Sequence, residues 1–400
     1  EGGRIFRMQA QNRRAAITGV GMSEIGRKLD IPASVLLAQA ARKAMALSGL
    51  TIADIDGLTT YPGKSDLAPG MSPLGCVEAR DILGLQTRWH SSSYDGPAQF
   101  SAIMIAAMAV ATGQARHVLC FRALTESSSQ SAKHRASLPT GGSTKIGGQF
   151  QWLLPMGAPS ATNWTAQFAT RIMHEYDLTR EDLGQQCIFQ RANAQKNPHA
   201  VFNGKMLSMD EYIGSRMISE PLCLFDCDIP IDGACAVIVS AADAAVDCHS
   251  DPIWIEAMGS ALTDRDSWDQ RTDLTTMAAH DVGKDLWART DFKPSDVDLA
   301  GLYDGFSIYV PMWLEALDFC GRGEGGQFIR AGKTTLEGEL PTNTSGGQLS
   351  EGRLHGFGLL HEICYQLWGL ADARQLAKAD CAVCGVGGGP VAGALLLIKE

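Results

Sequence analysis

The 400-residue sequence lacks any apolar run long enough to cross a membrane. Its longest apolar runs, residues 103–111 and 392–398, fall well short of the roughly 20 apolar residues that a membrane-spanning helix needs, so we expect no membrane span. Positive charge is also scarce. The 34 Lys and Arg residues against 44 Asp and Glu residues give a net charge of -10, which argues against nucleic acid as a partner.

The sequence also lacks the pattern of a secretory signal peptide and a cysteine framework. Its eleven cysteines are odd in number and scattered along the chain. Disulfide-rich domains are short, secreted and carry paired cysteines. We therefore expect reduced thiols and a cytoplasmic protein. Residues 1–13 are expected to form a tail and N-terminal extension, with the native start at Met8.

Complete metal and dinucleotide motifs are missing as well. Cys381 and Cys384 have the CxxC spacing, but they fall in a predicted strand and no second pair completes a zinc site. The glycine-rich residues 385–389 are followed by Pro390 and an apolar strand, whereas a dinucleotide loop opens a helix. We expect no metal site and no cofactor that this chain itself must hold.

What the chain does contain is one order of elements, used twice. An apolar strand, a helix and a turn into a second strand occupy residues 14–58 and again residues 253–302. Each half then offers a Gly-containing loop, an apolar helix and a strand, at 91–96, 97–112 and 117–121 in the first half and at 343–356, 357–370 and 381–386 in the second. Such repeats predict an α/β fold with helices covering the sheets.

This repeat divides the chain into an N-terminal half, residues 14–250, and a C-terminal half, residues 251–400. The N-terminal half contains an inserted loop region at about 125–220. Within it, residues 125–162 are rich in Ser, Gly, Pro and Thr and show little periodicity. Irregular stretches of this length are usually lids or binding loops.

Several segments resemble the thiolases, most closely the sterol carrier protein X and lipid-transfer branch. The most specific is 342–356 (TNTSGGQLSEGRLHG), and 231–234 and 385–390 are also similar. Residues 302–306 (LYDGF) and 323–326 (GEGG) resemble the aldolases that cleave steroid side chains as CoA thioesters. The resemblance implies a thiolase-like fold of two fused strand–helix repeats in a layered α-β-α-β-α core.

The chain departs from the thiolases at the residues that carry their chemistry. Ser93 stands where the resemblance places the cysteine nucleophile, and Arg353 stands in place of the histidine of the Gly-His-Pro motif. Gly385 stands in place of the second cysteine, with Cys384 one residue away. Serine is a poor nucleophile without an adjacent base, and arginine cannot serve as that base. Thiolytic cleavage is therefore disfavoured.

Retro-aldol cleavage of a 3-hydroxyacyl-CoA fits the remaining residues, because it needs only a base for the hydroxyl proton and donors that stabilise the thioester enolate. The related aldolases place one tyrosine at Tyr303 and a second at Arg353, so only the first is carried over. Our hypothesis is that Arg353 lies near Tyr303 and favours its phenolate, since a nearby cation lowers the pKa of a phenol. His355 then donates to the enolate oxygen or relays the proton. The reverse assignment, with His355 as base and Tyr303 as donor, stays open.

The remaining candidate residues have weaker signals. Asp304 is a catalytic candidate, although it could simply cap a turn. Candidate substrate-binding residues are Ser93, Asn343, Gly387 and Gly388. Ser93 precedes an apolar helix, where capping is a common role.

The resemblance also implies partners. We expect a homodimer, an acyl-CoA substrate whose coenzyme A is part of the substrate, and a small partner protein combining a zinc ribbon and an OB-fold. Residues 125–148 are a candidate for ordering on that association. Two alternatives stay open: an acyltransferase or Claisen-type enzyme using Ser93 or a thiol, and a non-catalytic acyl-CoA or lipid-binding subunit.

Overall fold

The computed structural model describes residues 15–65, 68–93, 100–130, 146–262, 265 and 267–400. Its strands are β1 (Ala15–Met22), β2 (Gly57–Thr60), β3 (Trp89–Ser92), β4 (His117–Thr125), β5 (Met217–Ser219), β6 (Leu222–Cys223), β7 (Asp232–Ala241), β8 (Ile253–Ala261), β9 (Leu299–Leu302), β10 (Cys381–Gly388) and β11 (Val391–Lys399).

The helices are α1 (Ala33–Ser48), α2 (Cys76–Leu83), α3 (Ser101–Ala111), α4 (Glu126–Ser129), α6 (Phe150–Leu153), α7 (Ala161–Glu175), α8 (Arg180–Gln195), α9 (Met209–Ile213), α10 (Ala242–Ala245), α11 (Ala278–Trp287), α12 (Tyr309–Ala316), α13 (Gly325–Arg330), α14 (Gly347–Ser350) and α15 (Phe357–Trp368). In the part of the chain that the structure describes, no helix has both the length and the apolar character needed to cross a bilayer.

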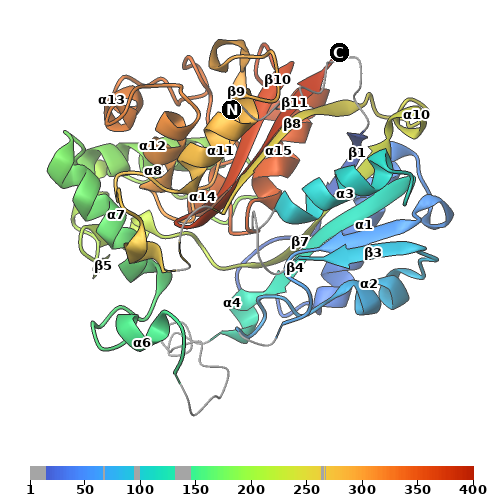
Figure 1. The fold of residues 1–400 in the computed structure, drawn as a ribbon, viewed down its shortest axis with the longest axis horizontal. Helices are drawn as coiled ribbons and strands as arrows, with labels where there is room; N and C mark the ends of the chain where they lie inside the picture. The colour runs from blue at the N-terminus through green and yellow to red at the C-terminus, as the bar shows by residue number, and fades with distance from the viewer. Residues whose placement is uncertain (1–14, 66–67, 94–99, 131–145, 263–264, 266) are drawn as a thin grey trace, which may run out of the picture.

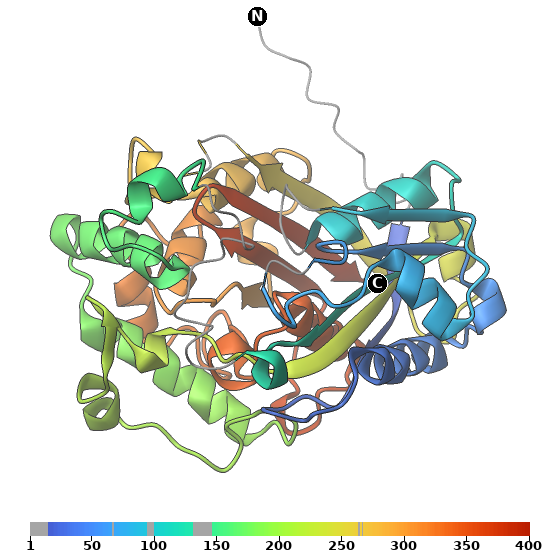
Figure 2. The same ribbon diagram turned by 90° about the horizontal axis from the view of Figure 1, so that it is seen from below.

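Nine of these strands form one continuous mixed sheet with the order β3-β2-β4-β7-β1-β8-β11-β10-β9, and β5 and β6 pair in a separate two-stranded sheet. The first five strands belong to the N-terminal half and the last four to the C-terminal half. The two parts meet through a short antiparallel pairing of β1 with β8, at Ala16 with Trp254 and Ile17 with Ile253. Within the parts, β2 runs parallel to β3 and β4, and β9 runs parallel to β10. Figure 2 shows the blue N-terminal and the orange and red C-terminal elements on opposite sides of the molecule.

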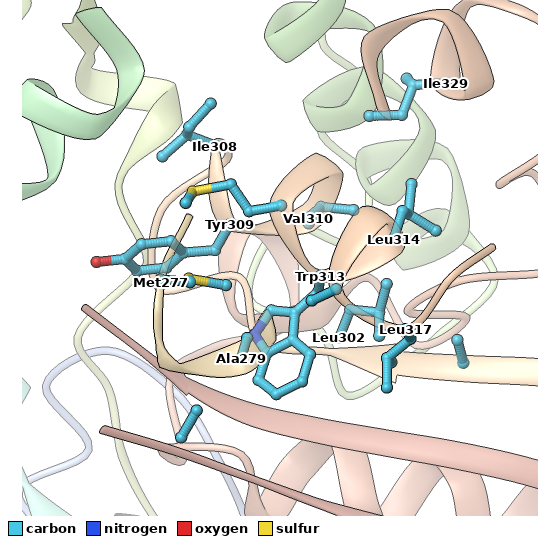
Figure 3. Close-up of a cluster of buried hydrophobic side chains, with 14 of the residues drawn as sticks. Met277, Ala279, Leu302, Ile308, Tyr309, Val310, Trp313, Leu314, Leu317 and Ile329 are labelled. Atoms are coloured by element: carbon cyan, nitrogen blue, oxygen red, sulfur yellow. The ribbon is translucent and has the colours of Figure 1, made fainter. Parts of the chain in front are cut away.

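Three apolar clusters show how the layers are ordered (Figure 1). The first packs α1 and α2 against β2, β4 and β7. The second packs α3 and α15 between strands of both halves. The third packs α7, α8, α11 and α12 against β8, β10 and β11, and Figure 3 shows part of it around Trp313. The order is therefore helices, N-terminal strands, helices, C-terminal strands, helices, which confirms the predicted layered fold.

The alternation of side chains along β7 explains why one strand serves two layers. Ala234, Ala236 and Ile238 belong to the cluster under α1 and α2, whereas Cys235 and Val237 belong to the cluster around α3 and α15. Successive side chains of a strand point to opposite faces, so an unbroken apolar run is what a strand covered on both faces requires.

The predicted repeat matches the elements closely. The helix expected at 357–370 is α15, which ends at Gly369 in the left-handed conformation (φ 74°) that favours glycine at this position. The loop expected at 91–96 begins later than predicted, because β3 extends to Ser92. Residues 94–96 lie outside the described residues. All eleven cysteines are free thiols.

Candidate active site

Tyr303 directly follows β9, and contacts to the backbone of Leu302 and of Tyr303 itself fix its position. The Asn343 side chain clamps Leu302: its Oδ1 accepts from the Leu302 N–H at 2.8 Å and its Nδ2 donates to the Leu302 carbonyl at 2.8 Å. The Tyr303 N–H donates to the carbonyl of Gly385 at 2.9 Å. The amide of Asn343, expected to bind substrate, is therefore occupied in holding the end of β9 in place.

Asp304 is completely buried and holds the 346–349 turn against β9. Its Oδ2 accepts hydrogen bonds from Gln190 Nε2 and from the N–H of Leu349. Burial raises the pKa of Asp304 to about 6, although these donors oppose the shift. The geometry makes Asp304 a positioning residue for the site. Its other oxygen, Oδ1, has no hydrogen-bond partner within the described residues.

His355 is held by a buried arginine from the other half of the chain. Nε and Nη2 of Arg122, which is 0% exposed, donate to Nδ1 of His355 at 3.3 and 3.1 Å. A guanidinium has only donors, so Nδ1 must be the acceptor and the ring proton must sit on Nε2. Burial and the two cations Arg122 and Arg353 lower the pKa of His355 well below its usual range. His355 is therefore a neutral donor, and the alternative in which it acts as base is disfavoured.

Arg353 is shared between two carboxylates. Its Nη2 and Nε donate to Glu126 Oε2 at 2.7 and 3.2 Å, and its Nη1 donates to Asp228 Oδ1 at 2.9 Å. Burial by itself would lower the pKa of Arg353, but the Asp228 and Glu126 carboxylates outweigh it and raise the pKa above its ordinary value. Arg353 is a permanent cation in this site and cannot accept a proton.

Tyr303 does lie near Arg353, but it is not a phenolate. Burial and the Asp228 carboxylate raise the pKa of Tyr303 above its ordinary value, and the opposing effect of Arg353 is smaller. Arg353 does lower the pKa of Tyr303, as expected, but burial and the Asp228 carboxylate outweigh it. Tyr303 is a neutral phenol, with the side chain of Gln348 beside it. The Nε2 of Gln348 is buried without a hydrogen-bond partner among the described residues, so it is a second donor available at this point.

The position of the second thiolase cysteine is closed by packing. A Cβ built on Gly385 would lie 2.7 Å from Cζ3 of Trp313. The neighbouring Cys384 is completely buried, and burial raises the pKa of its thiol above the ordinary value. Neither residue can supply the thiol acid and base of a thiolase.

We expect Gly385→Ala to lower the free energy of unfolding by about 1–3 kcal/mol, because the added methyl group must displace the Trp313 ring. Chemical denaturation measures the loss. Gly147→Ala is the matched control, since a Cβ there would meet nothing within 4 Å. Equal stability of the two variants would contradict the close packing.

The other predicted binding residues have structural contacts. A Cβ on Gly387 (φ 98°) would lie 2.4 Å from the Val391 carbonyl, and one on Gly388 would lie 2.7 Å from the Tyr309 ring. Both glycines are therefore required by the close approach of neighbouring groups. Ser93 follows β3 and its N–H donates to the Thr60 carbonyl at 3.3 Å. The residues that follow Ser93, 94–99, lie outside the described residues.

Three site residues were missed from the sequence: Arg122, Glu126 and Asp228. Arg122 lies in β4 among apolar residues, and a charged residue inside a buried strand is a signal that could have been used. Asp228 lies just before the 231–234 motif. Among the described residues, no group of three or more His, Cys, Asp or Glu side chains is placed to hold a metal ion.

Comparisons with known proteins identify the family of the chain. Residues 260–399 match the family model described as thiolase C-terminal domain-like. The chain is 35% identical to the steroid side-chain-cleaving aldolase of Thermomonospora curvata over 91% of this chain and 90% of that protein. It is 34% identical to the 17-hydroxy-3-oxo-4-pregnene-20-carboxyl-CoA lyase of Mycobacterium tuberculosis over 96% of this chain and 99% of that protein.

Solved structures point the same way. The structure of an Ltp2-ChsH2(DUF35) aldolase superposes with a TM-score of 0.85, at 31% identity over 98% of this chain and 99% of that one. Human mitochondrial 3-ketoacyl-CoA thiolase, at 14% identity and a TM-score of 0.68 over 98% of this chain and 100% of that one, shares the fold. The chain therefore belongs to the thiolase-like family, among the members that are carbon–carbon lyases of the aldolase type.

Proposed function

We propose that this chain cleaves a 3-hydroxyacyl-CoA by a retro-aldol reaction, with a steroid side-chain thioester as the substrate class. The products are a shortened acyl-CoA and a ketone or aldehyde. The observation that carries the proposal is the neutral phenol of Tyr303 beside buried donors, in a site without the thiols of a thiolase. The names of the two relatives, a steroid side-chain-cleaving aldolase and a 17-hydroxy-3-oxo-4-pregnene-20-carboxyl-CoA lyase, support the substrate class.

Each group then has a chemical role. Tyr303 hydrogen-bonds the substrate hydroxyl and takes part in moving its proton. The Nε2–H of His355 donates to the thioester oxygen as negative charge develops on it, and Gln348 Nε2 is placed to add a second donor. Neutral donors held in a buried site stabilise an enolate without having to reorganise during the reaction. Coenzyme A enters as part of the substrate.

The direct test is mass spectrometry of the products formed from a steroid side-chain 3-hydroxyacyl-CoA. We expect a shortened acyl-CoA and a ketone or aldehyde in equal amounts. The matched control is the same thioester without the 3-hydroxyl group, which should stay intact because it has no hydroxyl proton to remove. Survival of a whole series of 3-hydroxyacyl thioesters, with the partner protein present, would contradict the proposal.

A small zinc-ribbon/OB-fold partner belongs to the same proposal. The solved Ltp2-ChsH2(DUF35) aldolase, which superposes with the TM-score of 0.85, includes a DUF35 component in its name, and this supports a partner of that kind. The assay is therefore run with and without the partner protein. The homodimer stays a prediction.

We expect Arg122→Met to lower kcat/KM by about 10²- to 10³-fold, the usual effect of losing one oxyanion donor. Methionine cannot donate a hydrogen bond to Nδ1 of His355, so the ring proton is no longer fixed on Nε2. Arg122→Lys is the matched control, because one ammonium donor still satisfies Nδ1 and should restore part of the rate. Steady-state kinetics measures both variants, and equal rates for Met and Lys would argue against this role.

A further inference from the structure

Asp228 is held against the turn that carries Tyr303. The Asp228 N–H donates to the carbonyl of Gly305 at 3.2 Å, and the backbone of the preceding Cys227 forms an antiparallel β-bridge with that of Phe306. The Asp228 side chain is only 11% exposed. The chain therefore brings a carboxylate from just before β7 to the residues that directly follow Tyr303.

Within the described residues, one oxygen of this carboxylate accepts a hydrogen bond. Oδ1 accepts from Arg353 Nη1 at 2.9 Å, whereas Oδ2 has no hydrogen-bond partner within the described residues. Arg353 is shared between two carboxylates, because its Nε and Nη2 donate to Glu126. Asp228 therefore shares its cation with Glu126.

The surrounding charges leave Asp228 poised between its two protonation states. Burial raises the pKa of Asp228 to about 7, with the carboxylates of Glu126 and Asp304 adding to the shift and Arg353 opposing it. A Cβ built on Gly305 would lie 3.2 Å from the hydroxyl oxygen of Tyr303, and the Gly305 carbonyl accepts from the Asp228 N–H, so Asp228 and Tyr303 both lie next to Gly305. The Asp228 carboxylate also raises the pKa of Tyr303 and of Tyr309. The charged and titratable groups around it are Glu126, Cys227, Tyr303, Asp304, Tyr309 and Arg353.

Neither of the two residues expected to supply the base, Tyr303 or His355, is suited to it, and Arg353 is not a base either. Arg353 is a permanent cation, His355 is held as a neutral donor, and Tyr303 is a phenol that burial keeps protonated. A base for a reaction near neutral pH needs a group that exchanges its proton there. Two carboxyls of this cluster have a pKa raised toward neutrality, Asp304 and Asp228. Asp304 holds the 346–349 turn through Gln190 and the N–H of Leu349, whereas Asp228 pairs with Arg353 beside the residues that follow Tyr303.

We propose that Asp228 is the final acceptor of the substrate hydroxyl proton, with Tyr303 as the relay between them; this rests on the proposed retro-aldol function. As the substrate O–H bond breaks, its proton passes to the Tyr303 oxygen and the Tyr303 proton passes to Asp228. The electrons of the cleaved C–C bond move into the thioester enolate. The proton then returns through the same pair to the enolate carbon, so no proton is consumed overall.

The test is the pH profile of kcat/KM from about pH 5 to about pH 9 for the wild type and three variants. The wild-type rate should fall below the Asp228 pKa of about 7, because a protonated carboxyl cannot accept the proton. Asp228→Asn should lower the plateau by about 10²- to 10⁴-fold and remove this inflection. Asp228→Glu should keep the inflection and part of the rate.

Glu126→Gln is the matched control, because it removes the other carboxylate of Arg353 and leaves the proton acceptor in place. Glu126 raises the pKa of Asp228, so this variant should move the inflection to lower pH without removing it. If Asp228 only positions Arg353, Asp228→Asn and Glu126→Gln will lower the rate alike and both will keep the inflection. That result overturns the assignment.

An infrared difference spectrum separates this inference from the proposed function. Subtracting the Asp228→Asn spectrum from that of the wild type isolates the protonated carboxyl band of Asp228 as pH is varied. We expect the band to disappear as pH rises through about 7. A band that does not titrate near neutral pH overturns the inference even if the enzyme is active. A titrating band in a protein that cleaves no 3-hydroxyacyl thioester overturns the proposed function instead.

Discussion

Tyr303→Phe is expected to lower kcat/KM by about 10²- to 10⁴-fold, the range that general acid–base groups contribute. The variant loses the hydroxyl that we assign to proton transfer and keeps the ring, which packs against the clusters on both sides of the C-terminal strands. The fold should therefore be retained. Steady-state kinetics with a competent thioester measures the loss, and thermal unfolding confirms that the protein is intact.

Tyr309→Phe is the matched control for this substitution. The ring of Tyr309 lies 6.3 Å from that of Tyr303, and its hydroxyl is hydrogen-bonded to Thr165 Oγ1 at 2.7 Å. Removing this hydroxyl should cost about 1 kcal/mol of unfolding free energy and change kcat/KM little. If Tyr303→Phe were as active as Tyr309→Phe, Tyr303 would have no part in moving the proton.

Arg374→Met is expected to lower the free energy of unfolding by about 3–5 kcal/mol, because it leaves a buried carboxylate without its cation. Arg374 Nε and Nη2 each donate to Glu362 at 2.9 Å, and the two side chains are 8% and 5% exposed. Glu362 also accepts from Thr344 Oγ1 at 2.8 Å, so the pair ties α15 to the 343–356 loop. The pair lines a cavity of about 90 Å³ that includes neither Tyr303 nor His355.

Arg289→Met is the control for the buried pair. Arg289 Nη2 lies 2.8 Å from Asp285 Oδ1, a similar distance, but the side chains are 47% and 32% exposed. Water screens this pair, so its loss should cost less than about 1 kcal/mol. Chemical denaturation compares the two variants. Adding Glu362→Leu to Arg374→Met should recover part of the stability, because it removes the unpaired charge. Similar losses for both single variants would contradict the argument from burial.

Much of the fold could be predicted because its signals are local. The apolar run of β7 and the periodic helix α1 follow from the spacing of side chains along one segment, and the repeat of that pattern indicates two similar halves. The resemblance of residues 342–356 and 302–306 to known segments adds the layered order. The α/β repeat and the layered order are both confirmed, because the signals that predict them come from residues close together in the sequence.

The candidate residues of the site were partly predictable for the same reason. Tyr303, Arg353 and His355 stand in segments with a recognisable pattern, so their place in one site could be expected. The chemical roles of these three residues could not be predicted from the sequence. Asn343 was predicted to bind substrate, and that prediction gave no sign that its side chain clamps the backbone of Leu302, 41 residues earlier in the chain.

By itself, the sequence determined the α/β repeat, the absence of the thiolase nucleophile at Ser93 and the presence of Tyr303 after a buried strand. Only the tertiary structure decided the protonation of the site. Arg122 meets His355 across 233 residues, and Glu126 meets Arg353 across 227 residues. A pKa depends on burial and on charges a few ångströms away. Such neighbours are set by the folded chain and leave no periodic trace along it.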